Sequence, residues 1–547
     1  MLTAMTDQAA PAAGTPRRPI LPGPRRFLHP TAPAAPHAGS RVVWTVAVLA
    51  ALLRFPGLIW PLRPDEAGFG LVADAWDPGD GELYGPYWVD RSPILIAAVR
   101  AAHLLGGDYA LRLVAALGCV VLVVMSAMVA REIAALVQLE PHPRRERRAA
   151  VWAAVTAGAL VVNPMIDVIG AKGELLGLPV MMTGCWAAFR AVHLRQVGWA
   201  VVAGVMTALS MGLKQSQVSP AAFLGVLLLG VLLTRQRTWR EVLRLGFGML
   251  GGMALVIGAV CVWAVASGAG LDALWYAVVG FRGEATEVLA ATPSTAQETR
   301  AGELFGIAVL TGMVPVLLFF LAQLLPVLRV APVIALSVCT VIALDLVGVV
   351  LGGSYWTPYL FTPVVGLSLA MALLGATTDP GRGRRLTGLL LVSSLVVSSV
   401  VSLVVWTSDW VRGMVPYQVR VGSAIGAASE PGDTLVVYGG RADIQWASGL
   451  PSPYRHLWSL PMRTADPDLA ELQGLMNGPQ APTWVVTVAS LTAWDGFGQP
   501  LVAPLSSRYV PVGDGCGKWQ LYRLASVDRP TPTPDCTSPQ RGLLPRP

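Results

Sequence analysis

The carboxylates best placed to do chemistry lie in one short stretch, residues 63–91. It contains seven of the chain's 33 acidic residues, which are Asp65, Glu66, Asp74, Asp77, Asp80, Glu82 and Asp90. Asp65 and Glu66 directly follow the first long apolar segment, at the depth where lipid head groups meet water. Partial desolvation raises the pKa of a carboxylate and suits it to accept a proton, whereas the neighbouring Arg63 favours the ionised form. The stretch therefore predicts a general base beside a membrane.

Four aromatic residues are interleaved with these acids: Trp76, Tyr84, Tyr87 and Trp88. Amphipathic rings of this kind sit at membrane interfaces. They also form surfaces on which sugars stack. A solvated acidic loop, the ordinary meaning of a run of charges, is the alternative interpretation.

The composition is that of a polytopic membrane protein. Of 547 residues, 54% are hydrophobic and only 13% are charged, about half of the roughly 25% usual in soluble domains. The mean hydropathy is +0.57. The net charge of +7 comes from short clusters between apolar stretches, which is typical of loop charges that fix topology and not of a nucleic-acid surface. The sequence contains neither a Walker A motif nor a dinucleotide fingerprint, so a nucleotide-driven mechanism is disfavoured.

Eleven membrane spans bring every loop into agreement with the positive-inside rule. The expected spans are residues 42–62, 110–138, 150–168, 174–194, 198–213, 218–234, 246–267, 304–325, 329–351, 357–376 and 386–406. The N-terminus is then cytoplasmic, the C-terminus is outside, and residues 92–105 must lie along the outer interface instead of crossing. The predicted organisation is a disordered cytoplasmic tail (1–40), a transmembrane domain (41–407) with its first outer loop at 63–109, and an exported domain (408–547).

The exported domain is predicted to be a small α/β fold. Residues 435–440 and 483–488 read as strands, 466–476 as a helix, and YVPV and KWQLYRL as a late strand pair. Its only cysteines are Cys516 and Cys536, whereas the other four lie in apolar spans. This segregation favours a disulfide formed in an oxidising compartment over two free thiols.

Several short motifs together resemble the GT-C glycosyltransferases, in the protein O-mannosyltransferase and aminoarabinose transferase group. The matching segments are RPDE at 63–66, YWVDRSP at 87–93, Arg112 at the start of the next span, residues 352–370, and residues 438–455 in the exported domain. The family usually has two prolines in the second motif, where this chain has Ser92 and Pro93. The resemblance covers nearly the whole architecture: an all-α membrane protein of about eleven spans with a small exported α/β domain.

The resemblance implies an enzyme that moves a sugar from a polyprenyl-phosphate donor to a hydroxyl on the outer face of the plasma membrane, with inversion. It implies that Asp65 is the catalytic base, with Glu66 and Asp90 as second candidates. A lipid, a protein or a cell-wall glycan fits as the acceptor, and mannose, arabinose and aminoarabinose fit as the sugar. These point to a bacterial cell-envelope enzyme with membrane lipids, and no nucleic acid, among its partners.

The donor phosphate requires cations at the outer ends of spans, and Arg63, Lys172, Lys214 and Arg282 are the candidates. Lys offers a compact point charge, and Arg offers a two-pronged clamp. Ordinary snorkelling at helix ends is the alternative for each. Glu174 is also close enough in sequence to pair with Lys172 and neutralise it.

Five further residues are expected at the cavity or substrate: Trp88, Arg91, Tyr355, Trp356 and Tyr359. Anchoring in an aromatic belt is the alternative for the aromatic members. The six His residues show no ligand spacing, so a protein-held metal is not predicted. An Mg²⁺ or Mn²⁺ ion held by Asp90 and the donor phosphate stays open.

Two other function classes compete with the glycosyltransferase. A lipid or polysaccharide flippase is disfavoured, because the sequence shows no two halves with matching interrupted spans. The acids also gather in one outer loop instead of at mid-membrane. A non-catalytic cell-envelope assembly protein predicts that Asp65 and Glu66 are dispensable.

Overall fold

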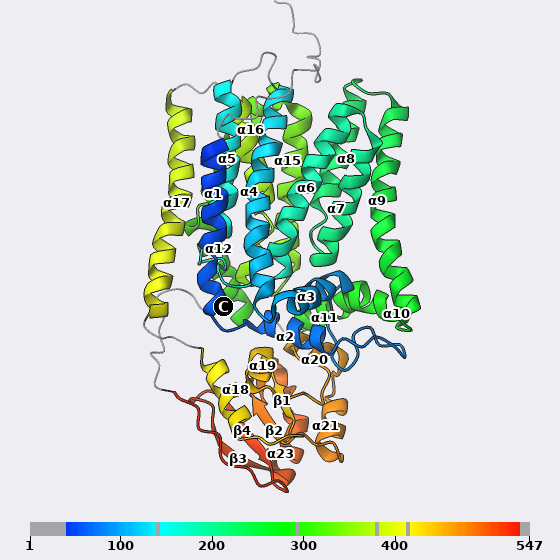
Figure 1. The fold of residues 1–547 in the computed structure, drawn as a ribbon, viewed down its shortest axis with the longest axis vertical. Coiled ribbons are helices and arrows are strands. Elements are labelled where there is room, and N and C mark those ends of the chain that lie inside the picture. Colours follow the sequence, from blue (N-terminus) through cyan, green and yellow to red (C-terminus); the bar gives the residue numbers. More distant parts are fainter. Residues whose placement is uncertain (1–39, 138–142, 292–294, 378–381, 412–415, 537–547) are drawn as a thin grey trace, which may run out of the picture.

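The computed structural model describes residues 40–137, 143–291, 295–377, 382–411 and 416–536. Figure 1 shows a bundle of long helices and, at one end of it, a smaller unit that contains a sheet. Almost all of the predicted N-terminal tail lies outside the described residues.

The bundle helices overlap the predicted spans, although the first of them ends at Leu52, well before the predicted end at residue 62. They are α1 (Ser40–Leu52), α4 (Ala110–Val137), α5 (Pro143–Val161), α6 (Gly173–Leu194), α7 (Val197–Leu213), α8 (Ser219–Leu233), α9 (Trp239–Ala266), α12 (Thr295–Leu310), α13 (Met313–Ala322), α14 (Leu324–Val330), α15 (Pro332–Leu351), α16 (Val364–Thr377) and α17 (Arg382–Val411). In the described part of the chain, six helices are long and apolar enough to cross a membrane, and the bent α12–α13 pair makes a seventh. The chain is therefore a multi-pass membrane protein, and the count of eleven crossings stays a prediction.

Burial orders the bundle from centre to edge. The apolar segment that includes α16 is 94% buried inside the protein, whereas the apolar segments of α9 and α17 are only 17% and 28% buried. Figure 1 accordingly shows α9 and α17 at opposite edges, where their apolar side chains are available to lipid. The start of α9 is fixed by a capping box, in which Thr238 and Glu241 each accept a hydrogen bond from the other's backbone N–H.

Short helices lie at the end of the bundle nearest the sheet-containing unit. They are η1 (Phe55–Ile59), α2 (Pro64–Asp74), α3 (Pro93–Gly106), α10 (Gly270–Trp275), the π-helix η2 (Tyr276–Gly280), α11 (Phe281–Ala291) and η3 (Thr357–Phe361). The segment expected along the interface is α3, which Figure 1 shows lying across this end of the bundle. Its first turn is set by Pro93 and by Ser92, whose hydroxyl accepts from the backbone N–H of Ile94 at 3.3 Å.

The C-terminal unit (residues 417–536) is an α/β fold, as its sequence predicts. It contains α18 (Tyr417–Ala427), β1 (Leu435–Tyr438), α19 (Ala442–Ser448), α20 (Ser459–Ala465), α21 (Ala470–Asn477), β2 (Trp484–Thr487), α22 (Ala493–Gly496), η4 (Gln499–Leu501), α23 (Val502–Arg508), β3 (Tyr509–Asp514) and β4 (Gln520–Leu524). The sheet order is β1-β2-β4-β3. β1 and β2 are parallel, with Leu435 opposite Trp484, and the remaining pairs are antiparallel.

Side chains of β1 and β2 alternate between two hydrophobic clusters. Val436 and Tyr438 enter one cluster, and Leu435 and Val437 enter the other. This period of two is what a strand covered on both faces requires, and it explains why both strands are continuous apolar runs.

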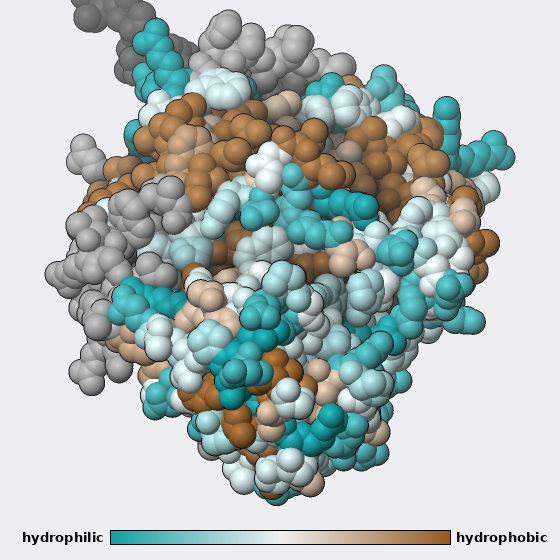
Figure 2. Space-filling model, turned by 60° about the horizontal axis from the view of Figure 1, so that its bottom comes forward, coloured by the Kyte–Doolittle hydropathy of each residue, from teal (hydrophilic) through white to brown (hydrophobic). Residues whose placement is uncertain are grey.

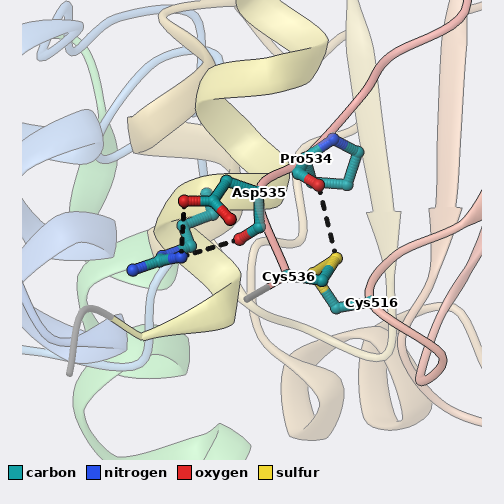
Figure 3. The surroundings of a disulfide bond; sticks show 5 residues. Cys516, Pro534, Asp535 and Cys536 are labelled. Atoms are coloured by element: carbon teal, nitrogen blue, oxygen red, sulfur yellow. Dashed lines mark hydrogen bonds and ion pairs between the residues drawn. A yellow bond between two sulfur atoms is a disulfide. The ribbon is translucent and has the colours of Figure 1, made fainter. Parts of the chain in front are cut away.

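Cys516 and Cys536 are joined by a disulfide. Cys516 lies in the turn between β3 and β4, so the bond ties this turn to the segment after β4 (Figure 3). Beside it, Arg420 of α18 contacts Asp535 at 3.0 Å. The other four cysteines have free thiols and lie in bundle helices.

Candidate active site

A cavity of roughly 830 Å³ lies between the end of the bundle and the C-terminal unit. Its wall carries nine Lys or Arg side chains and four carboxylates, and it includes all three lysines of the chain, Lys172, Lys214 and Lys518. Figure 2 brings this end forward and shows hydrophilic side chains below the hydrophobic surface of the bundle. The cavity therefore has a strongly positive wall next to the membrane-facing surface.

Asp65 lies on this wall, in the first turn of α2. Pro64 at the first helical position and the acidic residues that follow favour a helix start here. The Asp65 carboxylate contacts Lys172 Nζ at 3.0 Å through Oδ2 and accepts from Trp458 Nε1 at 3.2 Å through Oδ1. Its side chain remains 36% exposed, so the carboxylate is available to a ligand in the cavity.

The pKa of Asp65 lies below the ordinary value of an aspartic acid. Burial would raise this pKa, but Lys172, through its charge and its hydrogen bond, and then Arg91 and Lys214, lower it to about 2. Lys172 has its own pKa raised: burial alone would lower it, but Asp65, Asp167 and Glu174 more than compensate. Of the two opposing influences expected from the sequence, the one that favours the ionised form prevails, and the fold supplies it by bringing Lys172, Arg91 and Lys214 to Asp65.

Glu66 faces away from the cavity and is buried. Arg112 donates to both of its oxygens, at 2.9 Å and 2.7 Å, and the backbone N–H of Ala171 donates at 2.8 Å. These charges and hydrogen bonds lower the pKa of Glu66, although burial would raise it. Glu66 joins α2 to α4 and to the loop before α6, and it is absent from the cavity wall.

Asp90 lines the cavity between two guanidinium groups. Its Oδ2 lies 2.7 Å from Arg91 Nη1 and also pairs with Arg282. The charge of Asp90 is therefore already matched by protein cations, and these surroundings do not fit a metal ion. Among the described residues, no group of three His, Cys, Asp or Glu side chains could hold a metal.

The four cations expected to meet the donor phosphate all line the cavity: Arg63, Lys172, Lys214 and Arg282. Glu174 pairs with Lys214 at 2.6 Å, and not with Lys172, the alternative that the sequence left open. Lys172 reaches Asp65 instead because the loop before α6 packs against α2.

Three of the five expected cavity residues also line it, namely Arg91, Trp356 and Tyr359. Lys214 Nζ lies 5.0 Å from the Tyr359 ring centre, a cation–π geometry.

Trp88 and Tyr355 are absent from this wall, so their prediction as cavity residues is wrong. Trp88 is only 8% exposed and packs on Phe281, with ring centres 4.7 Å apart. Tyr355 has a left-handed backbone, with φ of +54°, and packs against the bundle core.

The cavity also contains residues that the sequence does not mark as functional. They are Arg300 of α12 and, from the C-terminal unit, Arg441, Trp458, Arg463, Trp494, Lys518 and Trp519. Strand register explains part of this set. Tyr438 pairs with Thr487, and Thr487 with Gln520, so the ends of β1 and β2 and the β3–β4 turn lie at one end of the sheet. Of these residues, the sequence could have indicated only Lys518, because lysine is rare in this chain and the other two lysines, Lys172 and Lys214, also line the cavity.

No family model matches this chain, and no curated protein matches its sequence. Its fold is similar to that of ArnT from Cupriavidus metallidurans in the apo state, at 15% identity and a TM-score of 0.44, over 89% of this chain and 98% of that one. ArnT bound to undecaprenyl phosphate is 16% identical with a TM-score of 0.44, over 90% of this chain and 99% of that one. The Archaeoglobus fulgidus oligosaccharyltransferase in complex with Zn and sulfate is 13% identical with a TM-score of 0.49, over 82% of this chain and 68% of that one.

These neighbours are GT-C glycosyltransferases, the class that the sequence motifs resemble. No activity follows from likenesses at 13–16% identity with TM-scores below 0.5. The case for a function rests on the cavity itself.

Proposed function

We propose that this protein is a membrane glycosyltransferase that moves a sugar from a polyprenyl-phosphate donor to a hydroxyl acceptor. One observation carries the proposal: a reachable, ionised carboxylate, Asp65, lies on the wall of a cavity that also holds all three lysines of the chain. A base and an anion-binding surface in one cavity are what transfer from a sugar phosphate needs.

Asp65 is the group proposed to accept the acceptor's proton. The hydroxyl oxygen forms a bond to the anomeric carbon as the bond from that carbon to the phosphate oxygen breaks, and the hydroxyl proton passes to Asp65. Because attack and departure take place on opposite faces, the anomeric configuration is inverted. Glu66 is less suited to this role, because Arg112 and Ala171 occupy its oxygens and it lies outside the cavity.

The departing phosphate is proposed to be stabilised by Lys172, Lys214, Arg63 and Arg282. In the ligand-free structure three of these cations contact carboxylates: Lys172 with Asp65, Lys214 with Glu174, and Arg282 with Asp90. These pairs orient the cations before the donor binds. The stabilisation is then available without reorganisation when charge develops on the leaving group.

The membrane orientation is part of the proposal. The cavity lies at the same end of the bundle as the C-terminal unit, so both would be on the outer face if the N-terminus is cytoplasmic. The disulfide between Cys516 and Cys536 supports an oxidising location for this end. A lipid, a protein or a cell-wall glycan remains the acceptor class proposed.

The first experiment is transfer from radiolabelled polyprenyl-phosphate mannose, arabinose and aminoarabinose in membranes, comparing the native protein with Asp65→Asn at matched expression. Asp65→Asn is expected to lower transfer about 10²- to 10⁴-fold, the usual contribution of a general base. Activity that survives Asp65→Asn would remove Asp65 from the proposed role. Absence of transfer from every donor by the native protein would favour the flippase or assembly function.

A further inference from the structure

We propose that Trp458 of the C-terminal unit is a positioning residue for Asp65, so that the C-terminal unit completes the site of chemistry as well as facing the acceptor. The proposal rests on the function proposed above. It concerns a residue 393 positions away from Asp65 in the chain.

The two oxygens of Asp65 are held by different parts of the molecule. Lys172 contacts Oδ2 from the bundle, and the indole N–H of Trp458 donates to Oδ1 from the C-terminal unit. Two contacts on two oxygens fix the plane of a carboxylate. Each oxygen keeps a further lone pair for a proton, so the contacts orient Asp65 without blocking it. A base gains most from such orientation when the reacting atoms must align closely.

The Trp458 ring fits closely over the first turns of α2. Gly68 lies three residues after Asp65, on the same side of the helix, and a Cβ atom there would overlap the six-membered ring of Trp458. The ring also packs on Phe69, with centres 5.6 Å apart. The missing side chain at Gly68 is therefore what allows the indole to reach Asp65.

The backbone that carries Trp458 is attached to the acidic first loop at three points. The Ser452 N–H donates to the Tyr87 hydroxyl at 3.0 Å, and the Trp88 N–H donates to the Arg455 carbonyl at 3.0 Å. Arg455 also pairs with Glu82. Residues 452–458 are thus fastened to the same loop that supplies Asp90 and Arg91, which gives the indole a fixed starting point.

A second tryptophan of the C-terminal unit supplies a matched control. Trp446 packs over Gly70, where a Cβ atom would lie 2.8 Å from its ring. It therefore contacts α2 in the same manner, but it does not line the cavity. Trp458→Phe and Trp446→Phe each remove one indole N–H and keep a ring. Gly68→Ala displaces the Trp458 ring, and Gly70→Ala crowds the rings of Trp446 and His103.

The test measures kcat and KM for donor hydrolysis and for transfer in these four variants. Trp458→Phe and Gly68→Ala are expected to lower kcat about 10-fold in both reactions, the effect of one hydrogen bond to a charged group, with the donor KM within about 2-fold. Equal kcat values in Trp458→Phe and Trp446→Phe would overturn the proposal.

A stability cycle tests the contact without activity. The shifts in thermal unfolding midpoint of Asp65→Ala, Trp458→Phe and the double variant should be non-additive, whereas those of Asp65→Ala with Trp446→Phe should be additive. Additivity for the Asp65 and Trp458 pair would overturn the contact. If the cycle is non-additive but the native protein transfers no sugar, the proposed function is rejected and the contact stands.

Discussion

Two adjacent carboxylates of α2 have opposite surroundings. The Asp65 side chain is partly exposed to a cationic cavity. Both oxygens of Glu66, in contrast, accept hydrogen bonds from Arg112 or from the backbone N–H of Ala171. Their separation follows from the helix itself, because successive residues point about 100° apart. The side chain at 65 faces the C-terminal unit, and the side chain at 66 faces the bundle.

Lys172 is expected to control the pH dependence of the reaction through Asp65. The native Asp65 pKa of about 2 keeps the base ionised throughout the ordinary pH range. Burial raises the Asp65 pKa and the charge of Lys172 lowers it, so the pKa is expected to rise in Lys172→Gln. As the pH is lowered, this variant should therefore lose activity at a higher pH than the native protein. The stability contributed by this pair is present above the unfolded pKa of about 3.9 and is lost as pH falls through the folded value.

The measurement for this prediction is the pH profile of kcat in Lys172→Gln and in Arg282→Gln. Both variants lose a cation of the proposed phosphate site, but Arg282 is not among the groups that shift the Asp65 pKa. Only Lys172→Gln should move the acidic limb. Equal movement in both variants would contradict the assignment.

At the scale of elements, the pair of Glu66 and Arg112 fixes α2 against α4. Their side chains are only 3% and 2% exposed. Arg112 also donates to the carbonyl oxygens of Trp60 and Pro61, which lead into α2. One guanidinium therefore holds the beginning of the helix that presents Asp65.

Arg112→Gln is expected to destabilise the protein by about 3–5 kcal/mol, because it leaves Glu66 charged and buried without its partner. Arg195→Gln is the control, since the side chains of its pair with Glu241 are 61% and 34% exposed and exposed pairs contribute about 0–1 kcal/mol. The measurement is the shift in unfolding midpoint in detergent. A shift for Arg112→Gln no larger than that for Arg195→Gln would contradict this anchoring role.

At the scale of the whole molecule, the site exists only where two units meet. The bundle end supplies Asp65 and most of the cations, and one end of the C-terminal sheet supplies Trp458, Arg463 and Lys518. Parallel pairing of β1 with β2 and the return of β4 beside β2 bring these distant segments to the same edge. The disulfide anchors the turn that carries Lys518.

Replacing Cys516 and Cys536 with Ser is expected to lower the stability of the C-terminal unit by about 3 kcal/mol, because the bond closes a loop with a sequence separation of 20 residues. The β3–β4 turn should also become more susceptible to proteolysis. Limited proteolysis and thermal unfolding, with and without a reducing agent, measure both effects. The reducing agent should lower the stability of the native protein and leave that of the double variant unchanged. An equal change in both proteins would contradict a stabilising role for the disulfide.

The sequence allowed several parts of the structure to be predicted from local patterns. Apolar runs gave the helix positions of the bundle, and alternation between two clusters explains why the runs at 435–440 and 483–488 formed strands. Asp65 and the four cations proposed to meet the phosphate lie on one cavity wall, as the sequence predicts. These features depend on residues close together in the chain or on ends of spans that must lie at one membrane face.

Other features depended on contacts that no local pattern contains. The aromatic character of Trp88 fitted a sugar surface equally well, yet the fold uses it to pack on Phe281. The partner of a charged side chain also depended on which segment packed beside it. Lys172 pairs with Asp65 and not with Glu174, and Glu66 pairs with Arg112 and does not face the cavity.

The sequence by itself determined that the chain is a multi-pass membrane protein with an acidic, aromatic first loop and an α/β unit after the last apolar helix, because hydropathy and strand alternation are local properties. Tertiary structure alone decided that Asp65 faces the cavity and Glu66 does not, that the pKa of Asp65 is low, and that Trp458 completes its surroundings. Those outcomes come from charges and hydrogen bonds between segments up to 393 residues apart, and such pairings are set only when the bundle and the C-terminal unit pack together.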